Sequence, residues 1–179
     1  MARSVEMTYG NALFLAAGTE ERLKALLPET EKVRRLYNGN PEAFRFVFMP
    51  ELSESEKLEQ LLSVFPETLP REIAGLFSVL LEKHRFDTLP GVLKYFADQA
   101  KEALGIGDVS VRTARPLTDE QKKKLEEKIL SATSFRSVDV KYLVEESLIG
   151  GMRIRIGDHI LDTSISTKLG ALTDALKKS

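Results

Sequence analysis

The sequence predicts an α+β protein: an N-terminal bundle of about six helices followed by a small strand-helix-strand-strand-helix α/β domain. Apolar residues recur at helical spacing up to Gly105, and no earlier stretch alternates convincingly with a period of two. After Gly105, short runs alternate apolar and polar residues, as half-buried strands do. We therefore expect two domains, residues 1–105 and 106–179.

Capping residues, prolines and glycines mark the expected helices. Their expected starts, in chain order, are Ser4, Thr19, Pro41, Ser53, Pro70 and Thr88. Ser53 and Glu56 have the spacing of a capping box, in which each side chain bonds the other residue's free backbone N–H. Pro28 lies inside the second helix and should kink or divide it. Gly18 and Gly105 are suited to end the first and the last of these helices.

The second domain is expected to begin with a strand at 109–113. Thr118 and Gln121 form another capping box, which opens a helix to about Ala132. Strands at 138–144 and 152–156 follow, and a last helix covers about 164–177. In "MRIRI", Met152 to Ile156, the arginines Arg153 and Arg155 lie on the face opposite the apolar residues.

Composition excludes several classes of function. The 179 residues carry a net charge of −1 and contain no cysteine, which removes disulfides, thiolate catalysis and cysteine–metal sites. The small charge bias gives no reason to expect a nucleic-acid or membrane-surface partner. No apolar run approaches the roughly 20 residues of a membrane span. Glu6, Thr8 and Asn11 interrupt the first apolar stretch, so we interpret it as a mature helix rather than a signal peptide.

The stretch "SLIGGMRIRIGDHILDTS" is the main candidate for chemistry. Gly150 and Gly151 could suggest a phosphate loop, but they lead into a strand, whereas phosphate loops usually open a helix. A tight turn that needs positive φ is the favoured interpretation. The alternative is a small enzyme or ligand-binding protein that holds a phosphorylated ligand at this turn.

The polar residues after that strand resemble parts of a catalytic triad. Asp158, His159, Asp162 and Ser164 lie too close together in the chain to be expected to align as one. Gly157 and Asp158 are better explained as a hairpin bend, and Asp162 or Ser164 as the cap of the last helix.

Other candidate sites also have simpler explanations. His84 has no second histidine nearby, so a packed or rim position is favoured over a metal site. The lysines at 122–124 are expected on a solvated helix face, although an RNA-binding module is a third possibility. We expect no catalytic residue, metal or cofactor.

The first helix is apolar nearly all round. Val5, Tyr9, Ala12, Leu13 and Ala16 form one stripe, and further apolar residues lie outside it. Such a helix is buried on more than one side. It is either a central helix of the bundle or a helix that packs inward on one face and receives a partner helix on another. Gly10, Ala12 and Ala16 would let that partner approach closely. The residues favour neither possibility over the other.

Four segments together resemble the delta subunit of the bacterial F-type ATP synthase, the counterpart of the mitochondrial oligomycin-sensitivity-conferring protein. They are "YGNALFLAA", "GLFSVLLEKHRFDTLPGVL", "TARPLTDEQ" and "SLIGGMRIRIGDHILDTSISTKL", and the resemblance covers essentially the whole chain. Glu145 and Glu146 stand where the family often has Asp-Pro, and Gly75 stands where it often has Asn.

The resemblance implies a non-catalytic subunit of the peripheral stalk, at the cytoplasmic face of the bacterial cell membrane. Such a subunit links the catalytic head to the membrane-anchored b subunits and resists rotor torque. It associates with the membrane only through the complex, and it needs no cofactor or nucleic acid. The helical domain would hold the N-terminal helix of an alpha subunit, at Tyr9, Ala12, Leu13, Ala16, Leu76, Val79, Leu80 and Lys83. The C-terminal domain would receive the b subunits, with candidates Arg153, Arg155, Leu169, Leu172 and Leu176.

Overall fold

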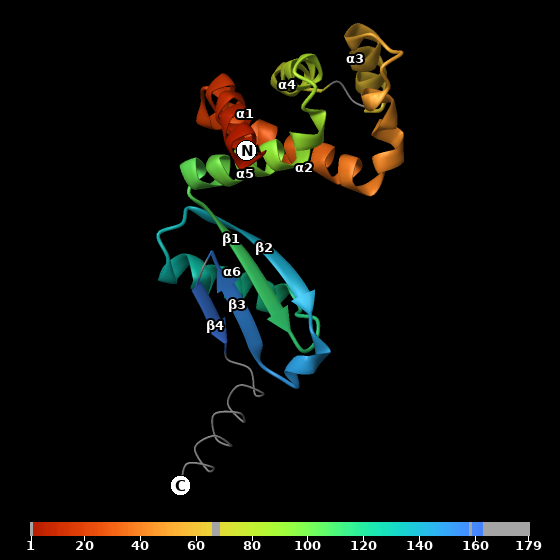
Figure 1. Ribbon diagram of the computed structural model, residues 1–179. Helices are drawn as coiled ribbons and strands as arrows, with labels where there is room; N and C mark the ends of the chain where they lie inside the picture. Colours follow the sequence, from red (N-terminus) through yellow and green to blue (C-terminus); the bar gives the residue numbers. More distant parts are fainter. Residues whose placement is uncertain (1, 66–68, 158, 163–179) are drawn as a thin grey trace. The chain divides into compact units, whose positions relative to one another are not determined.

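The structure is a computed structural model that describes residues 2–65, 69–157 and 159–162. The chain divides into two compact units, Met1–Leu104 and Gly105–Ser179. Figure 1 shows the helices of the first unit and the sheet of the second. In the described part of the chain, no helix is both long and apolar enough to cross a membrane.

The first unit is helical, as expected. Its elements are α1 (Ala2–Ala17), α2 (Glu20–Gly39), the 3₁₀ helix η1 (Pro41–Phe48), α3 (Glu54–Ser63), α4 (Arg71–Glu82), the short 3₁₀ helix η2 (Phe86–Thr88) and α5 (Leu89–Leu104). The capping box of Ser53 and Glu56 is present in full at the start of α3. Thr19 caps α2 by accepting a hydrogen bond from the backbone N–H of Arg22.

One local expectation was wrong, and another was wrong in part. Helix α1 already includes Ser4, so Ser4 does not cap it. Pro28 does not divide α2, which continues as one helix from Glu20 to Gly39. Proline removes one helical hydrogen bond, but buried Leu26 and Val33 anchor α2 in the core on both sides of it. The short helix predicted to open at Pro41 is present, as a 3₁₀ helix.

The centre of the helical unit is α5, which packs against both α1 and α2. Its inward residues, including Val92, Leu93 and Phe96, are almost completely buried. The rings of Tyr37, Phe44, Phe65, Phe77 and Phe86 form a connected aromatic cluster, with ring centroids 5.1–6.4 Å apart. In Figure 1, α1 and α4 lie on the same side of α5, and these two helices contact each other.

The second unit is a four-stranded sheet with one described helix. Its elements are β1 (Ile106–Thr113), α6 (Asp119–Ala132), β2 (Ser137–Val144), the 3₁₀ turn η3 (Glu146–Leu148), β3 (Met152–Ile156) and β4 (His159–Asp162). The strand order is β2-β1-β3-β4. Strands β1 and β2 are parallel, whereas the pairs β1–β3 and β3–β4 are antiparallel.

Strand β4 was not predicted. The sequence predicts a bend at Gly157 and Asp158 and a helix start at Asp162 to Ser164, with no strand between them, whereas His159–Asp162 pairs with β3 and Asp162 lies opposite Arg153. The sequence "HILD" is too short and too weakly alternating to indicate a strand, and its partner determines its conformation. The predicted last helix, at about 164–177, lies outside the described residues.

The core of the second unit lies between the sheet and α6. Val109, Val111 and Ile154 from the strands pack with Ile129 from α6. Figure 1 shows α6 behind the sheet, so one face of the sheet is covered by this helix. The opposite face carries the alternate residues of the strands, including Arg112, Arg153 and Arg155.

Candidate functional site

Two helices of the first unit bring the predicted alpha-subunit contacts together. We define the α1/α4 surface as Tyr9, Ala12, Leu13 and Ala16 of α1 with Leu76, Val79, Leu80 and Lys83 of α4. The two helices contact each other beside α5. Residues from positions about 60 apart in the chain therefore lie on neighbouring helices.

Burial separates these eight residues into two groups. Leu13, Leu76 and Leu80 are buried and hold the helices to the core. Ala12, Ala16, Val79 and Lys83 are exposed, and Tyr9 is half-buried between the groups. Only the second group and Tyr9 are available to a partner. The three leucines can act only by fixing the positions of α1 and α4.

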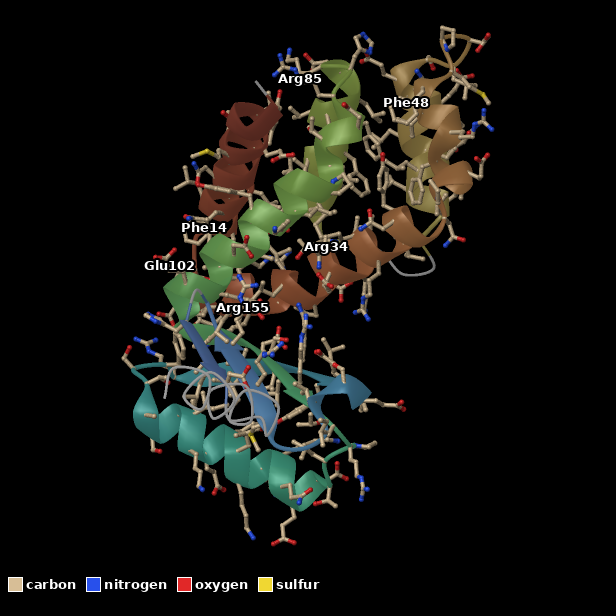
Figure 2. All side chains as sticks on the ribbon, turned by 60° about the horizontal axis from the view of Figure 1, so that its bottom comes forward. Phe14, Arg34, Phe48, Arg85, Glu102 and Arg155 are labelled. Carbon is tan, nitrogen blue, oxygen red and sulfur yellow. The ribbon has the colours of Figure 1, made fainter. Side chains whose placement is uncertain are left out.

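Helix α1 is not a central helix. It packs against α5 on one side, and apolar residues on its other sides remain exposed, including Leu15 with 75% of its surface accessible. Phe14, labelled in Figure 2, is half-buried on the same helix. This arrangement matches the interpretation in which one face packs inward and another is available to a partner.

Gly10 has a different role from the one expected. It is buried, and a Cβ at this position would lie 2.5 Å from Cδ1 of Tyr95 on α5. Its small size therefore lets α1 approach α5 rather than a partner helix. Of the three small residues proposed to admit a partner, only Ala12 and Ala16 are exposed.

The α1/α4 surface carries a positive charge at the end of α4. Lys83 Nζ donates a hydrogen bond of 2.7 Å to Oε1 of Glu82, and this bond is the largest cause of the raised pKa of Lys83. The charges of Glu82, Tyr9 and Glu54 raise the pKa further. The side chain is exposed, so a positive charge lies one helical turn from the apolar side chain of Val79.

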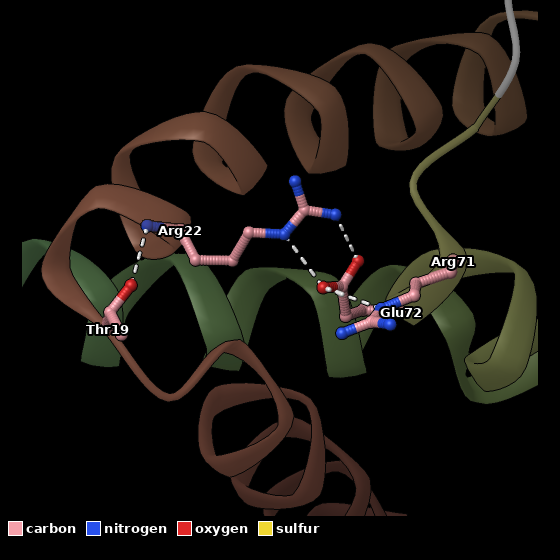
Figure 3. A network of polar contacts seen from close by, with 4 residues as sticks. All are labelled: Thr19, Arg22, Arg71 and Glu72. Carbon is pink, nitrogen blue, oxygen red and sulfur yellow. Dashed lines mark hydrogen bonds and ion pairs between the residues drawn. The ribbon is translucent and has the colours of Figure 1, made fainter.

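An ion pair fixes the start of α4 to α2. Arg22 donates from Nε to Oε1 of Glu72 at 2.8 Å and from Nη2 to Oε2 at 2.6 Å (Figure 3). Arg71 adds a longer contact of 3.7 Å to the same carboxylate. The hydrogen bond from Arg22 is the largest cause that lowers the pKa of Glu72 to about 2. Sequence reasoning missed this pair, because 50 residues separate its members and no local spacing indicates it.

The second candidate surface is the open face of the sheet. Arg153 of β3 donates from Nε to Oδ2 of Asp162 on β4 at 2.9 Å. Arg155 is exposed and donates to the backbone carbonyl of Gly157 at 2.9 Å. The two arginines therefore share a face, as expected. The guanidinium of Arg155 is the more accessible, since Arg153 is half-buried in its ion pair with Asp162.

Two residues of this face were not predicted. Arg112 on β1 lies opposite Arg153 and pairs with Glu145, with 3.0 Å between Nη1 and Oε2. Hydrogen bonds from Arg112 and Ser147 lower the pKa of Glu145. Arg112 alternates with buried Val111 and Thr113, so the period-two pattern could have identified it.

The turns before and after β3 agree with their expected structural roles. Gly151 has φ of 83° and Gly157 has φ of 56°, both in the region that glycine adopts at little cost. Gly150 is not among the positive-φ glycines, and Ile149 has φ of 58° instead. Asp162 is the last residue of β4 and pairs with Arg153, and its predicted role as the cap of the last helix depends on residues outside the described part of the chain. The predictions for five further residues fall outside the described part of the chain: Asp158, Ser164, Leu169, Leu172 and Leu176.

The described residues show no group of three or more His, Asp or Glu side chains that could hold a metal ion. His84 is exposed at the end of α4, and His159 is exposed on β4. The Gly150–Gly151 turn leads into β3 and not into a helix. This geometry does not support the alternative of a phosphate site at the turn.

Comparison with known proteins identifies the family. Residues 5–176 match the family described as "ATP synthase delta (OSCP) subunit". The chain belongs to this family. It is 30% identical over 178 residues to the ATP synthase subunit delta of Lachnoclostridium phytofermentans, covering 99% of this chain and 98% of that protein. It is 31% identical over 161 residues to the ATP synthase subunit delta of a Geobacillus species, covering 90% of each.

The fold agrees with the delta (OSCP) family. A chain in the cryo-EM structure of the Toxoplasma gondii mitochondrial ATP synthase hexamer matches with a TM-score of 0.66 and 23% identity, over 96% of both chains. As a member of the delta (OSCP) family, the chain is a structural, non-catalytic subunit of the ATP synthase in the peripheral stalk. The comparisons give no support to the phosphate-binding alternative.

Proposed function

We propose that the chain links the catalytic head of a bacterial F-type ATP synthase to the b subunits, at the cytoplasmic face of the cell membrane. In this proposal, the α1/α4 surface holds the N-terminal helix of an alpha subunit. Family membership and the two-unit architecture support a protein that binds the alpha subunit with one unit and the b subunits with the other. The stalk must resist rotation of the head, so its subunits need rigid packing and large interfaces rather than a titrating group.

The main support for the alpha-subunit contact is that the α1/α4 surface contains both buried residues, which fix the two helices, and exposed residues, which a partner can reach. Exposed Ala12 and Ala16 leave room for a close helix backbone, and exposed Val79 adds apolar area. Lys83 places a positive charge at one end. An amphipathic helix with an apolar stripe and an acidic residue at the matching end would complement these features.

Calorimetry with a synthetic alpha-subunit N-terminal peptide tests this contact. Ala16→Asp places a carboxylate on the surface and should weaken binding at least tenfold. Asn11→Asp is the matched control, because it adds the same charge to an exposed site about 140° away around α1. Leu80 is unsuitable for this test, since a carboxylate at that buried position would disrupt the core. Equal affinity for the two folded variants would show that the surface is misplaced.

For the second contact we propose that the open face of the sheet receives the ends of the b subunits. Exposed Arg155 supports this assignment, because its guanidinium can bind an acidic side chain. Arg155→Glu should weaken the complex with the soluble part of the b subunit, measured by sedimentation, and should leave binding of the alpha-subunit peptide unchanged. Lys128→Glu, at an exposed site on α6 and so on the covered side of the sheet, controls for the overall change in charge. An unchanged complex with the Arg155→Glu variant would exclude this face.

A further inference from the structure

A pocket with one buried cation lies in the helical unit. Its volume is about 240 Å³, and it is lined by Val47, Phe48, Pro50, Lys57, Leu80, Leu81, His84 and Phe86. These residues come from η1, α3, α4 and η2, except that Pro50 lies between η1 and α3 and His84 follows the end of α4. Leu81 and Val79 point about 160° apart around α4. The pocket is therefore on a different flank of α4 from the exposed part of the α1/α4 surface.

Lys57 is the unusual residue of this pocket. Only 9% of its surface is accessible, which is rare for a lysine without a partner. The described residues provide its ammonium group with no hydrogen bond or ion pair. Among the described residues, every fully buried side-chain nitrogen or oxygen atom has a hydrogen-bond partner. Its Nζ therefore keeps some accessible surface, and Lys57 is one of the residues that line the pocket.

The walls around Lys57 are mostly apolar. Val47, Leu81 and Phe86 are buried and line the same pocket as Lys57. Low-dielectric walls strengthen the attraction between the ammonium group and an incoming anion. A cation in such a place is unfavourable alone and is stabilised when a negative charge binds beside it.

His84 provides an independent indication of a site. It has φ of 51°, in the left-handed region usually taken by glycine at a helix C-terminus. Its N–H donates to the carbonyl of Leu81, and the N–H of Arg85 donates to the carbonyl of Leu80, both at 2.9 Å. These bonds form a Schellman motif with histidine at the glycine position. The motif places an imidazole, a second possible anion donor, among the residues that line the pocket.

We propose that this pocket binds an acidic side chain, Asp or Glu, of a partner protein segment that carries an apolar residue beside it. The carboxylate meets the ammonium group of Lys57, and the volume suits a single side chain. The apolar residue of the partner segment would pack against Phe48 and Met49. Both are exposed, and Phe48 (Figure 2) has 58% of its surface accessible. This contact shares only buried Leu80 with the α1/α4 surface, and it uses a different flank of α4.

The test uses the full chain and two short peptides. The first is N-acetyl-Leu-Glu-Phe-amide, and the second has Gln in place of Glu and differs in charge alone. Titrations are followed by NMR through the backbone signals of Lys57, Leu81 and His84 and through the methyl signals of Leu81. We expect the Glu peptide to bind at least fivefold more tightly than the Gln peptide, with shifts centred on the pocket.

Variants connect that preference to the pocket. Lys57→Met keeps an unbranched stem and should abolish the preference for Glu, whereas Lys94→Met, at an exposed site on α5, should preserve it. If Lys57→Met fails to fold, Lys57→Gln gives the same comparison with a polar side chain. His84→Gly should weaken binding of the Glu peptide two- to threefold. Equal affinities for the two peptides, shifts confined to the α1/α4 surface, or a preference that survives loss of Lys57 would each overturn the proposal.

Discussion

The ion pair of Arg22 and Glu72 offers a direct test of how the helical unit is held together. Glu72→Gln keeps the shape of the side chain and removes its charge. The pKa of Glu72 falls from 4.5 to about 2 in the folded chain. At 1.36 kcal/mol per pKa unit, that change sets a ceiling of about 3 kcal/mol. The Glu72 side chain is only 5% exposed, but Arg22 is 41% exposed, so solvent screening reduces the expected loss to about 1–2 kcal/mol.

Thermal unfolding followed by circular dichroism at 222 nm measures the loss, because the helical unit contributes most of the helix. A loss of 1–2 kcal/mol corresponds to a melting temperature lower by about 5–10 °C for a unit of this size. Glu82→Gln is the matched control, because its partner Lys83 is exposed. That variant should change the stability by less than about 0.5 kcal/mol.

The pH dependence gives the same pair a second signature. The folded-state pKa of Glu72 lies below its unfolded value, so its stabilisation is complete above pH 4.5 and is lost as the pH falls towards about 2. The difference in stability between wild type and Glu72→Gln should therefore shrink over that interval. If Glu72→Gln melts like the Glu82→Gln control at pH 7, or if the difference stays constant down to pH 2.5, the ion pair does not stabilise the unit as argued.

Three further outcomes are expected. Gly10→Ala should lower the stability by about 1–2 kcal/mol in urea unfolding, because its Cβ would meet the ring of Tyr95, and an unchanged midpoint would contradict that contact. His84→Gly should raise the stability by about 0.5–1 kcal/mol in the same assay, since glycine adopts its positive φ without strain; a loss would mean that the imidazole stabilises the fold. Burial, and then the hydrogen bond to Glu126, raise the pKa of Tyr142 to about 12. Ultraviolet titration should therefore find one tyrosine that ionises at a pH well above the usual tyrosine pKa of 10. The stability should fall as the pH rises from 10 to 12. Tyr142→Phe should remove this late ionisation step.

The sequence predicted correctly those features that depend on residues close together in the chain. The capping boxes at Ser53 and Thr118 form as their three-residue spacing indicated, because both partners lie in the same helical turn. The alternation of "MRIRI" correctly separated buried Ile154 from exposed Arg155. The grouping of the α1/α4 residues came from family resemblance, since periodicity alone cannot say which helices become neighbours.

Features that depend on distant partners were missed. Strand β4 is a strand because β3 pairs with it, and its four residues carry little preference of their own. Pro28 would end an isolated helix, but buried neighbours keep α2 continuous. The pocket around Lys57 collects residues from four elements, so no sequence window contains it. Exposure also depends on the whole fold, which is why Gly10 was assigned to the wrong neighbour.

The position of β1 in the middle of its sheet determines the order in which a growing chain can fold. Every partner of β1 is synthesised later: Ser137 pairs with Ile106 across 31 residues, and Ile154 pairs with Val111 across 43. The helices up to Leu104 are complete before either partner strand leaves the ribosome. Domains generally fold as units from the N-terminus, and long-range strand pairing is slow. During synthesis the helical unit can therefore fold, and can meet a partner, while β1 is still an unpaired strand with the apolar side chains of Val109 and Val111 exposed.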